Sequence, residues 1–322
     1  MSKRISILCI IILILGAFSL FIGVKDITPL SLFKMEPEKL EVFFISRVPR
    51  LMAILCTGMA LSVAGVIMQS VMSNNFVSPS TGSTMDWARL GVLISILFFP
   101  SASVGTKMLL ASSFAFVGSM LFIRLLRAIK LKDPIFTPLV GIMLGNVVMS
   151  VTTYIAYQHN LIQNISSWLQ GSFTMIIMGR YELLYIGIPL LIIAYIYATR
   201  FTIASMGSDF SNNLGISHST TVTIGILISS LITSVVVTVG IIPFIGLIVP
   251  NIVRMYSGDN LKSNIWEISL VGALFVLVCD MISRLLIYPF EIPISVIAGI
   301  IGSVFFLYFL LGGKKRHAKK SS

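Results

Sequence analysis

Long runs of apolar residues, separated by short polar segments, make up most of the chain. A hydrocarbon core about 30 Å thick needs about 20 apolar residues per helix, and a spanning segment must satisfy its backbone polar groups internally. The pattern therefore predicts an all-α membrane protein with about ten transmembrane helices. They are expected at residues 5–24, 51–71, 80–99, 107–126, 135–158, 182–199, 218–240, 243–257, 266–287 and 293–311.

The third, eighth and tenth runs are short or interrupted, so nine or eleven spans would also fit the pattern. The segments between the runs are too short for a soluble domain, and residues 1–322 are predicted to form a single transmembrane domain. The first run follows Ser2-Lys3-Arg4, as the apolar core of a secretory signal would. It is longer than a usual signal core and no small-x-small cleavage site follows it, which favours a spanning helix.

Composition supports the membrane assignment. Of the 322 residues, 56% are hydrophobic and 11% are charged, whereas about 25% of the residues of a soluble domain are charged. The formal net charge of +11 would suggest nucleic acid as the partner of a soluble protein. Because the basic residues stand between apolar runs, a membrane protein explains the charge better, and no nucleic-acid partner is predicted.

Cysteine, histidine and glycine give no sign of a bound cofactor. Cys9, Cys56 and Cys279 each lie inside an apolar run, and the three histidines are scattered over loops and the tail, so neither a disulfide framework nor a metal site is predicted. Residues 312–314 (Gly-Gly-Lys) lack the glycine spacing and the hydroxyl of a phosphate-binding loop. If ATP drives this protein, a partner subunit uses it.

Lysine and arginine set the expected orientation, because cytoplasmic loops of membrane proteins are enriched in both. With the N-terminus inside and ten spans, 15 of the 23 basic residues fall on the inner side, so both termini are predicted to be cytoplasmic. Arg47, Arg50, Arg180 and Arg284 are exceptions at outer helix ends. Each could extend to a phosphate headgroup, but as a group they suggest a second role.

The segment from Gly240 to Arg254 interrupts the apolar pattern most strongly, because it holds Pro243, Gly246 and Pro250. Irregular backbone at membrane depth is tolerated only where protein or a water-filled cavity satisfies the freed polar groups. The segment is therefore expected to be a broken helix beside a pathway, with an ordinary kinked helix as the alternative.

Motifs along nearly the whole chain add to this pattern. They are Arg47-Val-Pro-Arg50, Gly58, Leu61, Gly65, Gln69, Asn75, Pro79, Gly82, Trp168-Leu-Gln-Gly-Ser172, Asn213-Leu-Gly-Ile216, the Gly240 to Arg254 segment, Asp280, Arg284, Glu291-Ile-Pro293 and the Gly302 to Phe306 end. In this order and spacing they resemble the FecCD family of permeases, which import ferric siderophores, haem and vitamin B12 as parts of ABC transporters.

The chain departs from the family pattern at three places. Asn251 follows Pro250 where the family usually has histidine, and Ser303-Val304 stands where a proline usually precedes the final phenylalanines. After Gly82, the sequence Thr84-Met-Asp-Trp-Ala-Arg89 replaces the usual small residues. These features resemble the branch that handles ferric catecholate-type siderophores such as anguibactin and petrobactin.

The resemblance implies a fold like that of the vitamin B12 importer permease, a type II ABC importer, in the bacterial cytoplasmic membrane. It implies a second permease chain, identical or related, that shares the translocation path. It also implies two cytoplasmic ATPase subunits and an external lipoprotein that delivers the ferric siderophore. The permease itself would catalyse no reaction.

Three sets of residues are candidates for these functions. Arg47, Arg50 and Arg284 match family positions that pair with glutamates of the binding protein, and a guanidinium can grip a carboxylate with two N–H groups. The polar link between the sixth and seventh spans matches the ATPase-coupling segment, with a plain surface loop as the alternative. Its candidates are Ser208, Asp209, Phe210, Asn212, Asn213, Leu214 and Gly215. The candidates for the translocation path are Gln69, Asn75, Asp86, Arg89, Pro243, Gly246, Pro250 and Asn251.

Local spacing adds smaller expectations. Asp209 is expected to cap a short helix that ends near Gly215. Asp86 and Arg89, three residues apart, could neutralise each other on one helix face. The same argument applies to Asp280 and Arg284, which are four residues apart. The close approach of helices is expected at three glycines, which are Gly58, Gly65 and Gly82.

An ion-coupled secondary transporter is the main alternative function, because it would also have about ten spans and broken helices. Such a transporter should carry intramembrane acids and an internal repeat. Asp86 and Asp280 are the only acids that lend it support, and no repeat is evident in the sequence.

Overall fold

The computed structural model describes residues 3–23, 28, 36–128, 136–179 and 181–318. Some of the basic residues that entered the charge argument lie outside the described residues, namely Lys25, Lys34, Lys130, Lys132, Arg180, Lys319 and Lys320. Within the described part the regular structure is helical, with two isolated β-bridges.

Among the described residues, ten helices of 13 or more residues overlap the ten predicted runs. They are α1 (Lys3–Phe21), α4 (Val48–Val71), α5 (Thr84–Phe98), α6 (Val104–Ala128), α7 (Phe136–Gln158), α9 (Gly187–Ala204), α11 (His218–Val236), α12 (Ile245–Ser257), α13 (Leu261–Leu285) and α14 (Ile294–Ala318). The shorter elements are α3 (Pro37–Val42), η1 (Phe43–Arg47), η2 (Pro79–Gly82), α8 (Ile162–Leu169), η3 (Glu182–Ile186), α10 (Ser208–Asn213) and η4 (Val237–Val239).

Length and hydropathy separate these helices into two groups. Among the described residues, seven helical segments are long and apolar enough to cross a membrane: Lys3–Phe21, Pro37–Val71, Val104–Leu126, Leu139–Gln158, Glu182–Ala204, His218–Val239 and Leu261–Leu285. With 15 and 13 residues, α5 and α12 are shorter, and Ile294–Tyr308 of α14 is a shorter apolar stretch. The all-helical membrane fold is therefore confirmed, whereas the number of ten spans and the cytoplasmic termini stay predictions.

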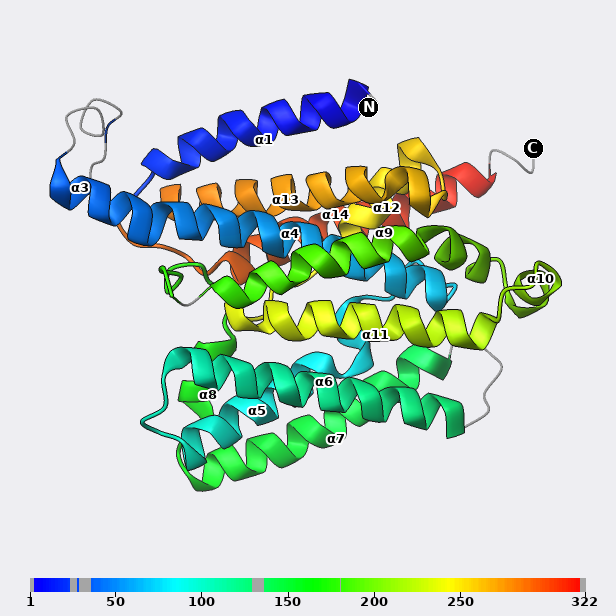
Figure 1. The fold of residues 1–322 in the computed structure, drawn as a ribbon, viewed down its shortest axis with the longest axis horizontal. Helices are drawn as coiled ribbons and strands as arrows, with labels where there is room; N and C mark the ends of the chain where they lie inside the picture. The colour runs from blue at the N-terminus through cyan, green and yellow to red at the C-terminus, as the bar shows by residue number, and fades with distance from the viewer. Residues whose placement is uncertain (1–2, 24–27, 29–35, 129–135, 180, 319–322) are drawn as a thin grey trace.

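The centre of the bundle is α4, which packs against α9, α11, α12 and α13 (Figure 1). In the segment Pro37–Val71, 78% of the most apolar window is buried, against 17% in α1. A Cβ atom on Gly58 would overlap the backbone of Gly272 in α13, and one on Gly65 would overlap Gly246 in α12. The expected close packing at Gly58 and Gly65 is confirmed. Gly82 is not closely packed against another backbone, because the atom nearest to an added Cβ would be a side-chain atom 3.4 Å away.

A second group of helices, α5, α6, α7 and α8, packs on the far side of α11 from α4 (Figure 1). It has its own cluster of buried apolar residues, to which α5 contributes Val92 and Leu93 and α8 contributes Ile165 and Leu169. On the other side of the molecule, α1 lies along α13.

The beginning of α1, the end of α14 and the short helix α10 lie at the same end of the bundle (Figure 1). The charge pattern assigns this end to the cytoplasm, and it is called the inner end below. The opposite end, where α3 and the last turn of α13 lie, is called the outer end.

Candidate functional site

The helical path is broken between α11 and α12, as the glycines and prolines of this segment predict. Gly240 has a φ of +88° and Phe244 a φ of +68°, so both residues adopt left-handed backbone that does not continue a helix. Phe244 is not a glycine, and such a conformation is held only where the surroundings fix it. Pro243 lies half-buried between these two residues.

The polar groups freed by this break are paired with a segment from α8. The N–H of Ile241 donates to Leu169 O at 2.8 Å, and the N–H of Ser172 donates to Val239 O at 3.1 Å. Gly240 and Gly171 leave no room for a Cβ against the facing backbone, which explains a glycine at each position. Two motifs that are about 70 residues apart, Trp168–Ser172 and the segment after Gly240, therefore form one structural unit.

A third motif joins this unit at the beginning of α14. The N–H of Ser295 donates to Gly171 O at 3.3 Å. Just before it, the N–H of Ile292 donates to Ser283 O of α13 at 3.1 Å. The segment Glu291–Pro293 is thus held between the end of α13 and the Trp168–Ser172 segment.

Pro250 leaves a helical carbonyl without its hydrogen-bond donor, and Gln69 supplies one instead. Proline has no N–H, so the carbonyl four residues earlier, that of Gly246, lacks its helical donor. The amide of Gln69, which is 1% exposed, donates to Gly246 O and Leu247 O, each at 3.3 Å. An otherwise costly buried glutamine is therefore explained by the proline in a neighbouring helix.

The other polar residues of this region complete one polar cluster between α4 and α12, in which Gln69 and Asn251 are buried and Asn75 is exposed. Asn251 donates from Nδ2 to Asn75 O at 2.9 Å and to Leu247 O at 2.8 Å. Arg254 donates from Nη1 to Gln69 Oε1 at 2.8 Å and to Asn75 Oδ1. Five of the eight path candidates, namely Gln69, Asn75, Gly246, Pro250 and Asn251, meet here. Their contacts are internal to the chain in this conformation, and a role on the path stays a prediction.

Arg254 also belongs to this cluster, although the sequence did not identify it as a candidate for the translocation path. It joins Gln69 and Asn75 and forms an ion pair with the exposed Asp259, Nε to Oδ1, at 3.6 Å. Its position as the last residue of the proline- and glycine-containing segment could have identified it as a candidate.

Asp86 and Arg89 lie on α5, away from the cluster between α4 and α12. Both are half-buried, and the contacts of the described residues include no direct ion pair between them. The Asp86 carboxylate instead lies against Gly145 of α7, where a Cβ would overlap Oδ2. The direct ion pair that the spacing of Asp86 and Arg89 predicted is therefore not formed.

A buried charge cluster lies at the outer end around Asp280. Arg50 donates from Nη2 to Asp280 Oδ1 at 2.8 Å, and Arg284 approaches Asp280 Oδ2 with Nη2 at 2.6 Å. The contact between Arg284 and Asp280 Oδ2 is an ion pair that lacks the geometry of a hydrogen bond, so Oδ2 accepts no hydrogen bond among the described residues. The expected pairing of Asp280 and Arg284 is confirmed, and Asp280 also binds a second arginine from α4.

Glu291 holds the other side of Arg50. The Nη1 atom of Arg50 lies 2.9 Å from Oε1 and 3.0 Å from Oε2 of Glu291, and the Thr174 hydroxyl donates to Oε2 at 2.7 Å. Although partial burial by itself raises the pKa of this carboxyl, the donors from Arg50 and Thr174 lower it below its usual value. Glu291 is therefore ionised at neutral pH.

Two arginines also bind the end of α1. Arg284 donates from Nη1 to Ser19 O and Ile22 O, each at 2.9 Å, and Arg47 donates to Ile22 O. The last carbonyls of a helix carry partial negative charge, so cations are favourable there. Arg50 and Arg284 are buried within the chain and Arg47 is half-buried. A docking role for these three arginines stays a prediction.

The link between α9 and α11 contains α10. The buried hydroxyl of Ser211 donates to Gly207 O at 2.8 Å and to Ile203 O at 3.1 Å, which fixes α10 to the end of α9. The helix ends before Gly215, whose φ of +74° is left-handed, as expected. The N-cap is Gly207, so the prediction that Asp209 caps the helix is wrong; Asp209 lies in the first turn.

The outward face of α10 is partly apolar. Phe210 and Leu214 are 47% and 55% exposed, although α10 lies at the end of the bundle where polar residues would be expected to face water. Ser208, Asn212 and Asn213 are also exposed. The predicted coupling residues therefore form one projecting surface at the inner end.

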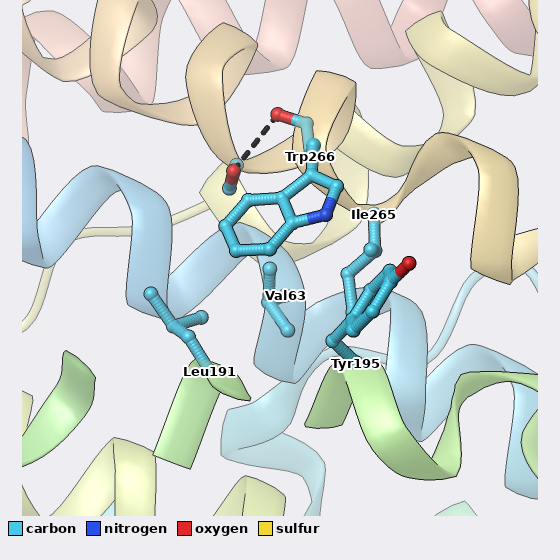
Figure 2. A pocket seen from close by; sticks show the side chains of 6 residues that line it. Val63, Leu191, Tyr195, Ile265 and Trp266 are labelled. Carbon is cyan, nitrogen blue, oxygen red and sulfur yellow. Dashed lines mark hydrogen bonds between the residues drawn. The ribbon is translucent and has the colours of Figure 1, made fainter. Parts of the chain in front are cut away.

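A small cavity lies between α4, α9 and α13 (Figure 2). Its volume is about 10 Å³, and it is lined by Val63, Leu191, Tyr195, Ile265, Trp266 and Ser269. The Ser269 hydroxyl donates to the carbonyl of Trp266 at 2.8 Å, within the helix. This volume is about that of one water-sized sphere, so the cavity cannot hold a larger solute.

Residues 9–312 match the model of the FecCD transport family. The chain belongs to this family. It is 54% identical over 312 residues to the petrobactin import system permease protein YclN of Bacillus subtilis, covering 97% of this chain and 99% of that protein. It is 40% identical over 303 residues to the ferric-anguibactin transport system permease protein FatD of Vibrio anguillarum, covering 94% and 96%.

The fold of this FecCD permease is also that of a solved transporter. A metal-chelate type ABC transporter in an inward-facing conformation superposes with a TM-score of 0.86 at 25% identity, covering 98% of this chain and 100% of that chain. The FecCD protein is therefore a non-catalytic permease subunit of an ABC importer and a multi-pass protein of the bacterial inner membrane. Membership in the family sets aside the alternative of an ion-coupled secondary transporter.

Proposed function

We propose that this FecCD permease imports ferric siderophores of the catecholate type that includes petrobactin and anguibactin. The supporting observation is the 54% identity to a petrobactin import permease over almost the full length of both chains. In this proposal the chain binds no cofactor, and ATP is bound and hydrolysed by partner subunits.

Three kinds of partner follow from the family: a second permease chain, ATPase subunits and a binding protein. We place the translocation path between two permease chains, identical or related. The dense packing of α4 against its neighbours supports this position, since a path through the centre of one chain would have to separate helices at Gly58 and Gly65. Two cytoplasmic ATPases would bind at the inner end and a siderophore-binding lipoprotein at the outer end.

Transport by the reconstituted importer tests this function. The permease, its partner chain, ATPases and binding protein are placed in proteoliposomes, and uptake of ⁵⁵Fe-petrobactin is measured. We expect uptake with ATP and background uptake with an ATPase variant that binds but does not hydrolyse ATP. Uptake driven by an ion gradient without ATP would overturn the proposal, and uptake of ferric citrate but not ferric petrobactin would overturn the substrate class.

The exposed apolar side chains of Phe210 in α10 and of Leu214 just after it lead to a testable prediction. We expect Phe210→Ser combined with Leu214→Ser to lower the ATPase rate stimulated by the binding protein at least about fivefold, because buried apolar anchors dominate protein interfaces. The stability of the permease should not change, because both side chains are exposed.

The measurement is ATP hydrolysis by the complex in nanodiscs. Met255→Ser is the matched control, since it removes a side chain that is 50% exposed on α12. Full stimulation in the double variant would contradict a coupling role for α10.

A further inference from the structure

The outer charge cluster has one member that is much more accessible than the others. The side chain of Glu291 is 22% exposed, whereas those of Asp280 and Arg284 are 1% and 2% exposed. Glu291 approaches Arg50 from the loop before α14, and Asp280 approaches the same guanidinium from within α13. Arg50 would therefore keep its inner partner if Glu291 moved away.

The surface beside this pair has the character of a protein contact. In the loop between α13 and α14, Leu286, Tyr288 and Phe290 are 63%, 55% and 74% exposed. Clustered exposed apolar side chains next to a few charged groups are typical of interaction surfaces. An acidic protein that covers this loop would bring its carboxylates close to Arg50.

Glu291 is also connected to the broken segment by consecutive hydrogen bonds. The Thr174 hydroxyl donates to Glu291 Oε2 at 2.7 Å and accepts from the Ser172 hydroxyl at 2.9 Å. The N–H of Ser172 in turn donates to Val239 O, at the end of η4. A displacement of Glu291 would remove an anchor of the segment that is paired with the break.

We propose that Glu291 pairs with Arg50 before docking and is replaced there by a carboxylate of the binding protein when that protein docks. The exchange leaves the charge on Arg50 compensated, so the contact area of the docked protein, not the ion pair, supplies the free energy. The released Glu291 no longer holds Thr174, and docking is thereby transmitted to the break between α11 and α12. Glu291 is a positioning residue in this scheme, which rests on the proposed docking of an acidic binding protein.

Removal of the competing charge gives the first test. Glu291→Gln should lower the Kd for the binding protein at least about fivefold, because Arg50 becomes available. Glu182→Gln is the control: it removes one negative charge from an exposed carboxylate that accepts from Gly179 N and Tyr181 N and has no part in the cluster. We expect it to change the Kd less than about twofold. Equal changes in both variants, or weaker docking to Glu291→Gln, would overturn the exchange.

Removal of the connection gives the second test. Thr174→Val should leave the Kd within about twofold but lower the ATPase rate stimulated by the binding protein at least about threefold. Thr106→Val, at an exposed threonine in the first turn of α6, is the control and should lower neither. Unchanged stimulation in Thr174→Val would overturn the transmission step. If the binding protein does not dock to the unmodified permease at all, the proposed docking fails and the exchange fails with it.

Discussion

Asp280→Ala is expected to destabilise the permease by about 3–5 kcal/mol, because it leaves Arg50 and Arg284 without their shared partner inside the protein. Both arginines are buried, and Arg284 in addition fixes the end of α1. The loss should appear as a large drop in the thermal unfolding midpoint in detergent and as less folded protein in the membrane.

The control for this variant is Asp259→Ala. Asp259 also pairs with an arginine, but its side chain is 88% exposed and the atoms are 3.6 Å apart, so we expect a change of about 0–1 kcal/mol. Similar unfolding midpoints for the two variants would contradict a structural role for the buried cluster.

Gly65→Ala is the second substitution with a large expected effect. The new Cβ would overlap the carbonyl group and Cα of Gly246, which are backbone atoms that cannot rotate away. The helices α4 and α12 would have to separate, at an expected cost of about 3 kcal/mol or more. We expect little folded protein by size-exclusion chromatography and a lower unfolding midpoint.

Gly16→Ala in α1 is the matched control, because the nearest atoms to its Cβ would be side-chain carbons of Leu51 at 3.6 Å. It should be neutral, or stabilising by up to about 1 kcal/mol through helix propensity. Equal unfolding midpoints for Gly65→Ala and Gly16→Ala would show that the crossing of α4 and α12 tolerates a methyl group.

The apolar runs predicted the positions of the long helices well, because a spanning helix must be both apolar and long. They did not predict α8, whose eight residues begin only four residues after α7 ends. The break at Gly240 was predictable from its glycines and prolines. Its pairing with the Trp168–Ser172 segment was not, because backbone hydrogen bonds between distant segments leave little trace in side-chain type.

The candidate residues show the same difference between local and distant information. The pairing of Asp280 with Arg284 followed from a spacing of four on one helix, and it is present. The second partner of Asp280, Arg50, is 230 residues away in sequence and depends on how α4 packs against α13. Spacing also suggested a pair of Asp86 and Arg89, but the packing of α5 on α7 directs Asp86 towards Gly145 instead.

The amide of Gln69 and the missing N–H of Pro250 belong to different helices, yet each is explained by the other. A residue with an N–H at position 250 would donate to the Gly246 carbonyl within the helix. The amide of Gln69 would then lose that carbonyl as an acceptor. The two positions are therefore expected to vary together among related permeases, so that an exchange at one is tolerated best when the other has already changed.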